Sequence, residues 1–145
     1  ALSESVVSRL RENGFQCKVI EMSIRDNELY HFSRQCKLKR PTNITDEIVQ
    51  AAYRLFKDNY RWEHPIRSLG VRGCDLVSDD MPYQLDLFMS EQKREKLEKM
   101  DQVVDEIRAR FGYQSIQRAF VYQDRLLAQL NAREHTVHPQ GYFHG

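Results

Sequence analysis

The pattern of apolar and polar positions predicts two packed helices in the first part of the chain. Apolar residues recur at helical spacing over residues 1–13, which end at an Asn-Gly stop, and again over residues 45–59. Thr45 is the expected N-cap of the second helix, because Asp and Glu follow it in the first turn. Both helices are expected to cover one face of a sheet.

Residues 15–25 and 29–40 alternate between apolar and polar positions and predict a β-hairpin, with its turn at the run Asp-Asn-Glu between them. A three-residue turn places Ile20, Met22 and Ile24 on the core face, together with Tyr30, Phe32 and Leu38. The opposite face then holds Cys17, Val19, Glu21, Ser23, Arg25, His31, Ser33, Gln35, Lys37 and Lys39. A slip of one residue would exchange the two faces, and Arg34 falls on the mostly apolar face in this register.

Residues 66–77 are rich in aliphatic and β-branched side chains and predict another strand, with Leu69 and Val71 on one face and Ser68, Gly70 and Arg72 on the other. The predicted fold class is therefore α+β, with a small mixed or antiparallel sheet and helices on one of its faces. Three parts are expected: a core over residues 1–78, a loop over 79–89, and a helical extension with a tail over 90–145.

In the extension, Ser90 is the expected cap of a long helix that ends at Gly112. Its apolar residues, spaced three and four apart, form a narrow stripe suited to packing along another helix, either of this chain or of a partner protein. The stripe consists of Leu97, Met100, Val104, Ile107 and Phe111. A short strand over residues 115–122 and a helical turn over 125–130 are predicted before a mobile tail.

Composition indicates one domain of a cytoplasmic protein. The chain has 145 residues, and no apolar run approaches the roughly 20 residues of a membrane span. Its three cysteines form no close pair, which favours a reducing compartment. The net charge is only +1, but residues 16–40 hold six basic side chains against three acidic ones, so one face is expected to be basic.

No constellation predicts catalysis or a metal site. Histidines 135, 138 and 144 lie in the tail without a cysteine or carboxylate cluster, Asp79 and Asp80 are interpreted as solvated, and no base accompanies a cysteine nucleophile. Tyr30, Phe32 and Trp62 are expected in the core rather than as platforms for base stacking.

Two short segments resemble parts of a known family. Arg67-Ser68-Leu69-Gly70-Val71-Arg72, followed by Leu76, resembles the last strand of the little-finger domain of Y-family translesion DNA polymerases, in the ImpB/MucB/SamB/UmuC group. Residues 84–88, Gln-Leu-Asp-Leu-Phe, resemble the pentapeptide with which bacterial polymerases bind the sliding clamp. The resemblance implies a non-catalytic DNA-binding domain, while catalysis and its Mg²⁺ belong to a palm domain that this sequence does not resemble.

The resemblance also implies site residues. Contacts to the phosphates of primer-template DNA are expected from Ser33, Arg34, Arg67, Gly70 and Arg72 by family position, and from Lys18, Lys37, Lys39 and Arg40 by charge alone. Contacts to the sliding clamp are expected from Gln84, Leu85, Asp86, Leu87 and Phe88. No cofactor is expected in this part of the polymerase.

In the family, a strand precedes the first helix, so the resemblance implies that one strand of the sheet is missing here. An open sheet edge normally has to be covered. Either residues 115–122 or a second protomer, in a homodimer, is expected to cover it. The alternative function is a non-polymerase adaptor that binds proteins through the 84–88 peptide and the long helix.

Overall fold

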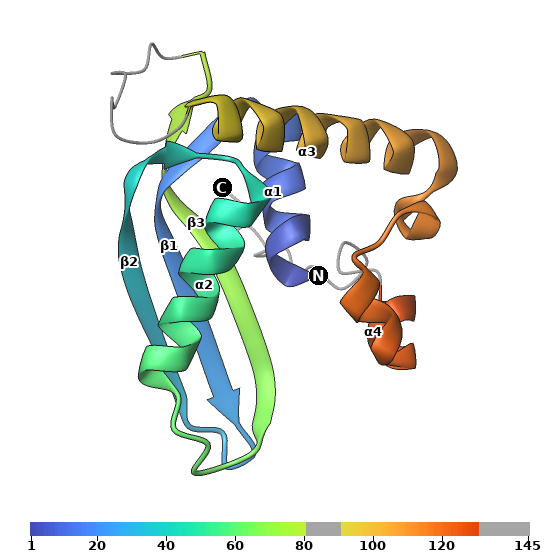
Figure 1. The fold of residues 1–145 in the computed structure, drawn as a ribbon. Helices are drawn as coiled ribbons and strands as arrows, with labels where there is room; N and C mark the ends of the chain where they lie inside the picture. The colour runs from blue at the N-terminus through green and yellow to red at the C-terminus, as the bar shows by residue number, and fades with distance from the viewer. Residues whose placement is uncertain (81–90, 131–145) are drawn as a thin grey trace, which may run out of the picture.

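Three antiparallel strands form one sheet in the order β2-β1-β3, and two helices lie across it (Figure 1). The structure is a computed structural model that describes residues 1–80 and 91–130. In chain order the elements are α1 (Leu2–Glu12), β1 (Phe15–Asp26), β2 (His31–Thr42), α2 (Thr45–Asn59), β3 (Ile66–Ser78), α3 (Glu91–Phe111), the 3₁₀ turns η1 (Tyr113–Ser115) and η2 (Ala119–Gln123), and α4 (Arg125–Gln129). The predicted α+β class is confirmed.

The core lies between the sheet and the pair of helices α1 and α2. Ile20, Met22 and Ile24 of β1 are fully buried and meet Val7 of α1 and Ile48 of α2. Both helices therefore cover the same face of the sheet, as the alternation predicted, and the burial of these aliphatic side chains is the main source of stability.

The predicted faces of the hairpin are confirmed at its centre, but the pairing is shifted by two residues from that of a three-residue turn, because Ile24 pairs with Phe32 and Met22 pairs with Arg34. Phe32 packs against the core as expected. Tyr30, however, is 67% exposed, so its assignment to the core is wrong. The carboxylate of Asp26 accepts hydrogen bonds from the amides of Glu28 and Tyr30, and this lengthens the turn so that β2 begins only at His31.

Cys17 also differs from the prediction, because it is fully buried on the helix-covered face rather than on the polar one. The pairing of β1 with β2 shifts between Cys17, which faces Thr42, and Val19, which faces Lys37. Such a β-bulge reverses the alternation of side chains along the strand. Burial raises the pKa of the Cys17 thiol to about 11, so this thiol is neutral at physiological pH.

Helix α2 begins one residue earlier than predicted, with Ile44 rather than Thr45 at the N-cap. Ile44 has no side chain that accepts a hydrogen bond, and the amide of Thr45 donates instead to a carboxylate oxygen of Asp101 on α3, at 2.8 Å. The first turn of α2 is thus capped by a residue that is 56 positions away in the chain.

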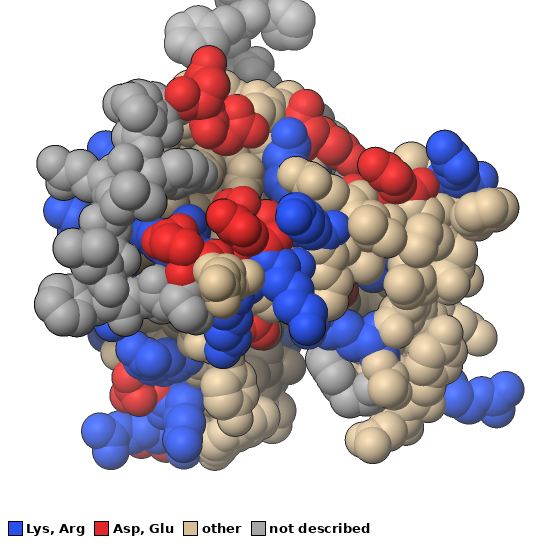
Figure 2. Space-filling view, turned by 45° about the horizontal axis from the view of Figure 1, so that its top comes forward, with Lys and Arg blue, Asp and Glu red and all other residues tan. Residues whose placement is uncertain are grey.

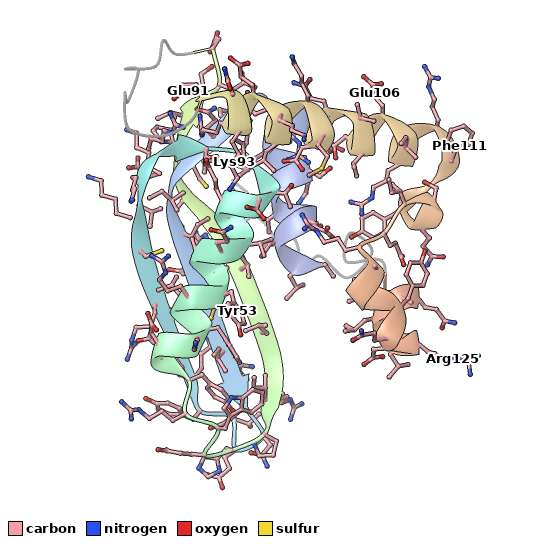
Figure 3. All side chains as sticks on the ribbon, viewed as in Figure 1. Tyr53, Glu91, Lys93, Glu106, Phe111 and Arg125 are labelled. Carbon is pink, nitrogen blue, oxygen red and sulfur yellow. The ribbon has the colours of Figure 1, made fainter. Side chains whose placement is uncertain are left out.

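Helix α3 packs through polar side chains rather than through the predicted apolar stripe. Its buried residues are Arg94 and Asp101, whereas Phe111 is 74% exposed and lies at the end of α3 that is farthest from the sheet (Figure 3). Glu106 also points away from the core. The expectation that the stripe would pack along another helix of this chain is therefore wrong for its C-terminal part.

The strand predicted over residues 115–122 is wrong, because this segment forms η1 and η2. Local hydrogen bonds replace strand pairing: the amide of Ser115 donates to Gly112, and that of Val121 donates to Arg118. This segment therefore covers neither edge of the sheet. The predicted helical turn that follows is confirmed as α4, and the mobile tail predicted over residues 133–145 lies outside the described residues.

Candidate nucleic-acid interface

The second face of the sheet carries no helix among residues 1–80 and 91–130, and we call it the open face. It comprises Val19, Glu21, Ser23 and Arg25 of β1, His31, Ser33, Gln35 and Lys37 of β2, and Ser68, Gly70, Arg72 and Cys74 of β3. Most of these side chains are polar and exposed, and none belongs to the buried core. Strand alternation alone places them together.

The open face carries an excess of positive charge. Its one acidic residue, Glu21, accepts a hydrogen bond from the amide of Gln35 at 2.6 Å and forms a 3.6 Å ion pair with Arg72. Arg25 and Lys37 form no ion pair with any described residue. These two cations remain available to an anionic ligand, and Arg72, which is exposed, is only loosely held.

Small side chains run across the middle of the open face. Ser23 of β1 pairs with Ser33 of β2 on one side and with Gly70 of β3 on the other. A Cβ atom on Gly70 would lie 2.5 Å from the hydroxyl oxygen of Ser23, so only glycine fits beside the serine in this conformation, and no side chain projects from this position. A nucleic-acid backbone can therefore approach the strands closely, with serine hydroxyls ready to donate to phosphate oxygens.

The structure brings together only some of the predicted DNA contacts. Ser33, Lys37, Gly70 and Arg72 share the open face. Arg34 lies on the helix-covered side, with its guanidinium 5.1 Å from the centre of the Phe32 ring. The other four predicted contacts lie where the strand pairing is irregular. Lys18 lies in the bulge of β1, and Arg67 lies where the pairing of β1 with β3 shifts. Lys39 and Arg40 lie between the last regular pair of β2, at Lys37, and Thr42.

Arg40 is engaged inside the molecule. Its guanidinium donates to the carboxylate of Glu91 on α3 at 2.9 Å, and its side chain is largely buried. The charge pattern of the sequence does not distinguish Arg40 from the exposed Lys39. In the structure, however, Arg40 binds α3 and is not available at the surface like Lys39.

Arg25 and His31 complete the basic part of the open face and were not among the predicted contacts. Arg25 pairs with His31 on β2 and with Ser68 on β3, and both are exposed. The same alternation that placed Lys37 outward could have identified them, because residues two apart on a strand share a face.

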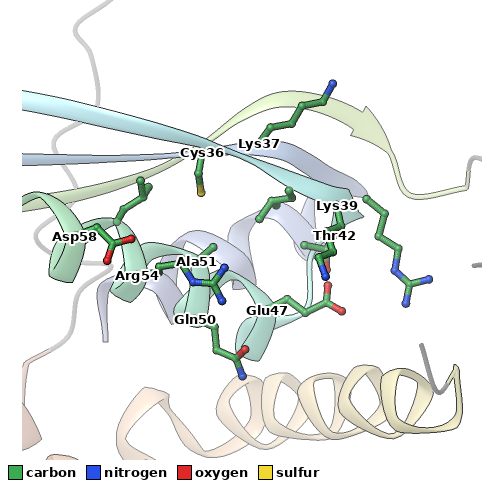
Figure 4. A pocket seen from close by; sticks show the side chains of 12 residues that line it. Cys36, Lys37, Lys39, Thr42, Glu47, Gln50, Ala51, Arg54 and Asp58 are labelled. Carbon is green, nitrogen blue, oxygen red and sulfur yellow. The ribbon is translucent and has the colours of Figure 1, made fainter. Parts of the chain in front are cut away.

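A pocket of about 350 Å³ lies on the other side of β2, between this strand and α2 (Figure 4). Cys36 and Arg54 point into it, whereas Gln50 lies at its rim and donates to Asp46. Burial raises the pKa of Cys36, although the nearby Arg54 guanidinium opposes this shift. Glu47 and Asp58 also line this pocket, but no hydrogen bond or ion pair joins either of them to Cys36 among the described residues, so no chemistry is assigned to it.

On the α3 side, the arginines that face α1 and α2 are paired with carboxylates. Figure 2, which turns this side toward the viewer, shows acidic and basic side chains next to one another. Arg11 of α1 binds Asp105 at 2.6 Å and Asp101 at 3.2 Å, and Arg94 binds Glu47 of α2 at 2.7 Å. These cations are already neutralised, and the open face is the better candidate for phosphate.

Neither a metal centre nor a membrane span emerges from the parts of the chain that the structure describes. Within residues 1–80 and 91–130, no three His, Cys, Asp or Glu side chains are grouped as metal ligands. In the same residues, no helix has both the length and the apolar character needed to cross a bilayer.

Fold and charge together define a small α+β domain whose open, predominantly cationic sheet face is backed by two helices and is the candidate nucleic-acid interface. The impB/mucB/samB family C-terminal domain matches residues 1–87. The chain therefore belongs to this family of Y-family polymerases, as the sequence resemblance predicted. This result favours the polymerase hypothesis over the adaptor.

The relatives that it resembles are bacterial DNA polymerases IV. The chain is 44% identical to the enzyme of Acetivibrio thermocellus over 129 residues, which is 89% of this chain and 32% of that protein. It is 38% identical to DNA polymerase IV 2 of Bacillus subtilis, over 81% of this chain and 28% of that protein. The chain thus spans about a third of the length of these relatives, and the alignment of 129 residues extends past residue 87.

Proposed function

We propose that this chain is the DNA-gripping part of a bacterial translesion DNA polymerase and that the open face binds the phosphates of the primer-template. The proposal rests on one observation: Arg25 and Lys37, which form no ion pair with any described residue, lie on the same face as the small residues Ser23, Ser33 and Gly70. Lys and Arg that neutralise phosphates release counterions, so binding is independent of sequence and depends steeply on salt.

Fluorescence anisotropy with a primer-template duplex tests this proposal. In the variant Arg25→Ala, Lys37→Ala, Arg72→Ala, the affinity should fall, and the slope of log K against log salt should drop by about 0.9 for each lost phosphate contact. The matched control removes three exposed lysines of α3, Lys93, Lys96 and Lys99, with the same change in net charge. An equal loss of affinity in both variants would show that the total charge matters and the open face does not.

We further propose that residues 84–88 tether the polymerase to the sliding clamp. These residues lie outside the described part of the chain, so support comes from the sequence alone: all five positions fit the clamp-binding pentapeptide. Leu87 and Phe88 supply the apolar anchors, and Gln84 supplies a hydrogen bond at the rim of the clamp's cleft.

Surface plasmon resonance on immobilised clamp tests the tether. Leu87→Ala with Phe88→Ala should abolish binding and leave the melting temperature nearly unchanged. The control pair Leu126→Ala with Leu127→Ala removes two exposed apolar side chains of α4 and should bind as the wild type does. The assignment would be contradicted if the Leu87→Ala, Phe88→Ala variant unfolded, or if it folded and still bound the clamp.

We propose that this chain is part of a longer cytoplasmic polymerase. Catalysis, the Mg²⁺ that it needs and the choice of lesion would then belong to the other domains of that polymerase.

We also propose that the isolated chain forms a homodimer, because β2 and β3 each leave one strand edge without a partner among the described residues. Light scattering tests this arrangement, and a concentration-independent monomer would refute it.

A further inference from the structure

A cluster of aromatic rings lies at the end of the sheet where the β1–β2 turn meets the segment between α2 and β3, at the lower end of Figure 1. The amide of Asn27 donates to the carbonyl of Pro65 at 3.0 Å and joins the two segments. Between them lies a pocket of about 220 Å³, which we call the aromatic pocket. Its lining includes Tyr30, Phe32, Arg34, Asn59, Tyr60 and Arg61.

Tyr30, Phe32 and Tyr60 line the pocket, and of these Phe32 and Tyr60 also pack against the core. Tyr30 lies 6.2 Å from Phe32, and Tyr60 lies 5.2 Å from Trp62, edge to face. Tyr30 and Trp62 are 67% and 68% exposed, so the expected core position is wrong for both. Trp62 also adopts a φ of 58°, a backbone conformation that bulky residues rarely take. Large open aromatic surface of this kind favours a ligand with a flat ring.

Two arginines line the aromatic pocket and can contact an anionic ligand. Arg61 forms no ion pair with any described residue, and Arg34 donates only to the neighbouring carbonyl of Ser33. The lining also holds two carboxylates, Asp26 and Glu63, and Asp26 accepts the amides of the turn. The two guanidinium groups are therefore balanced in number by carboxylates, but neither forms an ion pair with a described residue, and both remain available to phosphate oxygens.

We propose that the aromatic pocket binds an unpaired nucleobase of single-stranded DNA, stacked on Tyr30. The base fits the pocket between Tyr30 and Tyr60, while Arg61 and Arg34 lie within the lining to meet the adjoining phosphates. The aromatic pocket lies on the helix-covered side of β2, where Phe32, Arg34 and Tyr60 line it. It borders the open face only at the β1–β2 end of the sheet, where Tyr30 directly precedes His31. This inference rests on the proposed function for the identity of the ligand as DNA, and adds a single-strand site beside the surface that binds the duplex.

Trp62 is the single tryptophan of the chain and reports on the aromatic pocket through its contact with Tyr60. We would titrate the full chain with a short oligothymidylate and with an abasic oligonucleotide of the same length, which keeps the phosphates and lacks the bases. The oligothymidylate should quench the tryptophan fluorescence, and the abasic strand should bind more weakly by about tenfold without quenching. Equal binding and equal quenching by the two strands would overturn the proposal.

Three variants locate the stacking ring. Tyr30→Ala should weaken binding of the oligothymidylate by about tenfold, and Tyr30→Phe should keep it, because phenylalanine retains the ring face. Tyr53→Ala is the matched control, since Tyr53 is 65% exposed, lies on α2 (Figure 3) and does not line the pocket. An unchanged affinity in folded Tyr30→Ala would overturn the proposal.

A blunt duplex separates the two proposals. If the duplex binds with steep salt dependence and Trp62 fluorescence stays unchanged with every oligothymidylate, the aromatic pocket has no nucleobase function and the open face keeps its own. If neither nucleic acid binds at any salt concentration, both proposals are wrong.

Discussion

At the scale of single residues, Glu47 shows how burial and pairing compete. Burial alone would raise the pKa of this carboxyl, but hydrogen bonds from Arg94 and Thr42 and the charges of Arg94 and Arg40 outweigh it and lower the pKa below its ordinary value. The unfolded chain therefore takes up this proton more readily than the folded one. The stabilisation by Glu47 is complete above its ordinary pKa and is lost as the pH falls through the lowered value in the folded protein.

The variant Glu47→Gln should consequently be less stable than the wild type at pH 7, by about 1 kcal/mol, because the charged hydrogen bonds to Arg94 become neutral ones. The difference should shrink as the pH falls below the ordinary pKa of 4.5. Urea denaturation at a series of pH values measures it. A constant difference between the two proteins at all pH values would contradict the assigned ionisation.

Cys17 marks a limit of what alternation predicts. The bulge at this residue depends on the pairing of β1 with β2, and nothing in the local sequence indicates it. The centre of β1, in contrast, was predictable, because Ile20, Met22 and Ile24 are aliphatic at every second position and the opposite positions are polar.

At the scale of elements, the docking of α3 depends on Arg11. Its guanidinium forms two hydrogen bonds with Asp105, at 2.6 and 3.0 Å, and donates to Asp101, Thr45 and the carbonyl of Asn43. One side chain of α1 thus links α3 to the start of α2. The sequence predicted α3 from its apolar stripe, but these partners are 90 or more residues apart and no local pattern connects Arg11 to Asp101.

Arg11→Met should destabilise the folded chain by about 3 kcal/mol, because Asp101 and Asp105 lose their main cationic partner while Asp101 stays buried. Lys96→Met is the control, since Lys96 is exposed on the same helix that carries the two carboxylates. Thermal and urea denaturation measure both variants. Equal, small effects would show that α3 docks without this ion pair.

At the scale of the whole molecule, the sequence predicted the three strands described here, the covered face and every open-face residue but Cys74, because these follow from strand alternation and from a family motif on β3. The aromatic pocket was missed. Its rings come from the β1–β2 turn and the segment after α2, and aromatic residues near apolar runs are usually core residues. Exposure at such a junction depends on how two loops meet, which periodicity does not describe.

A shorter chain that ends at residue 87, where the match to the family domain ends, tests how far the core stands alone. We expect it to fold with a clearly lower midpoint of urea denaturation, because Arg11, Arg40 and Glu47 lose their partners on α3. Circular dichroism during denaturation measures the midpoint. A midpoint equal to that of the full chain would show that α3 adds nothing to the stability of the core.

Because Asp101 accepts the amide hydrogen of Thr45, the first turn of α2 reports on a helix that follows much later in the chain. Each time α3 lifts from the core, this amide becomes accessible to solvent and can exchange its hydrogen for deuterium. The exchange rate of a single proton therefore measures how often α3 opens while the sheet stays folded. If α3 and the core instead open only together, the Thr45 amide will exchange as slowly as the amides of Ile20 and Met22 in the centre of β1.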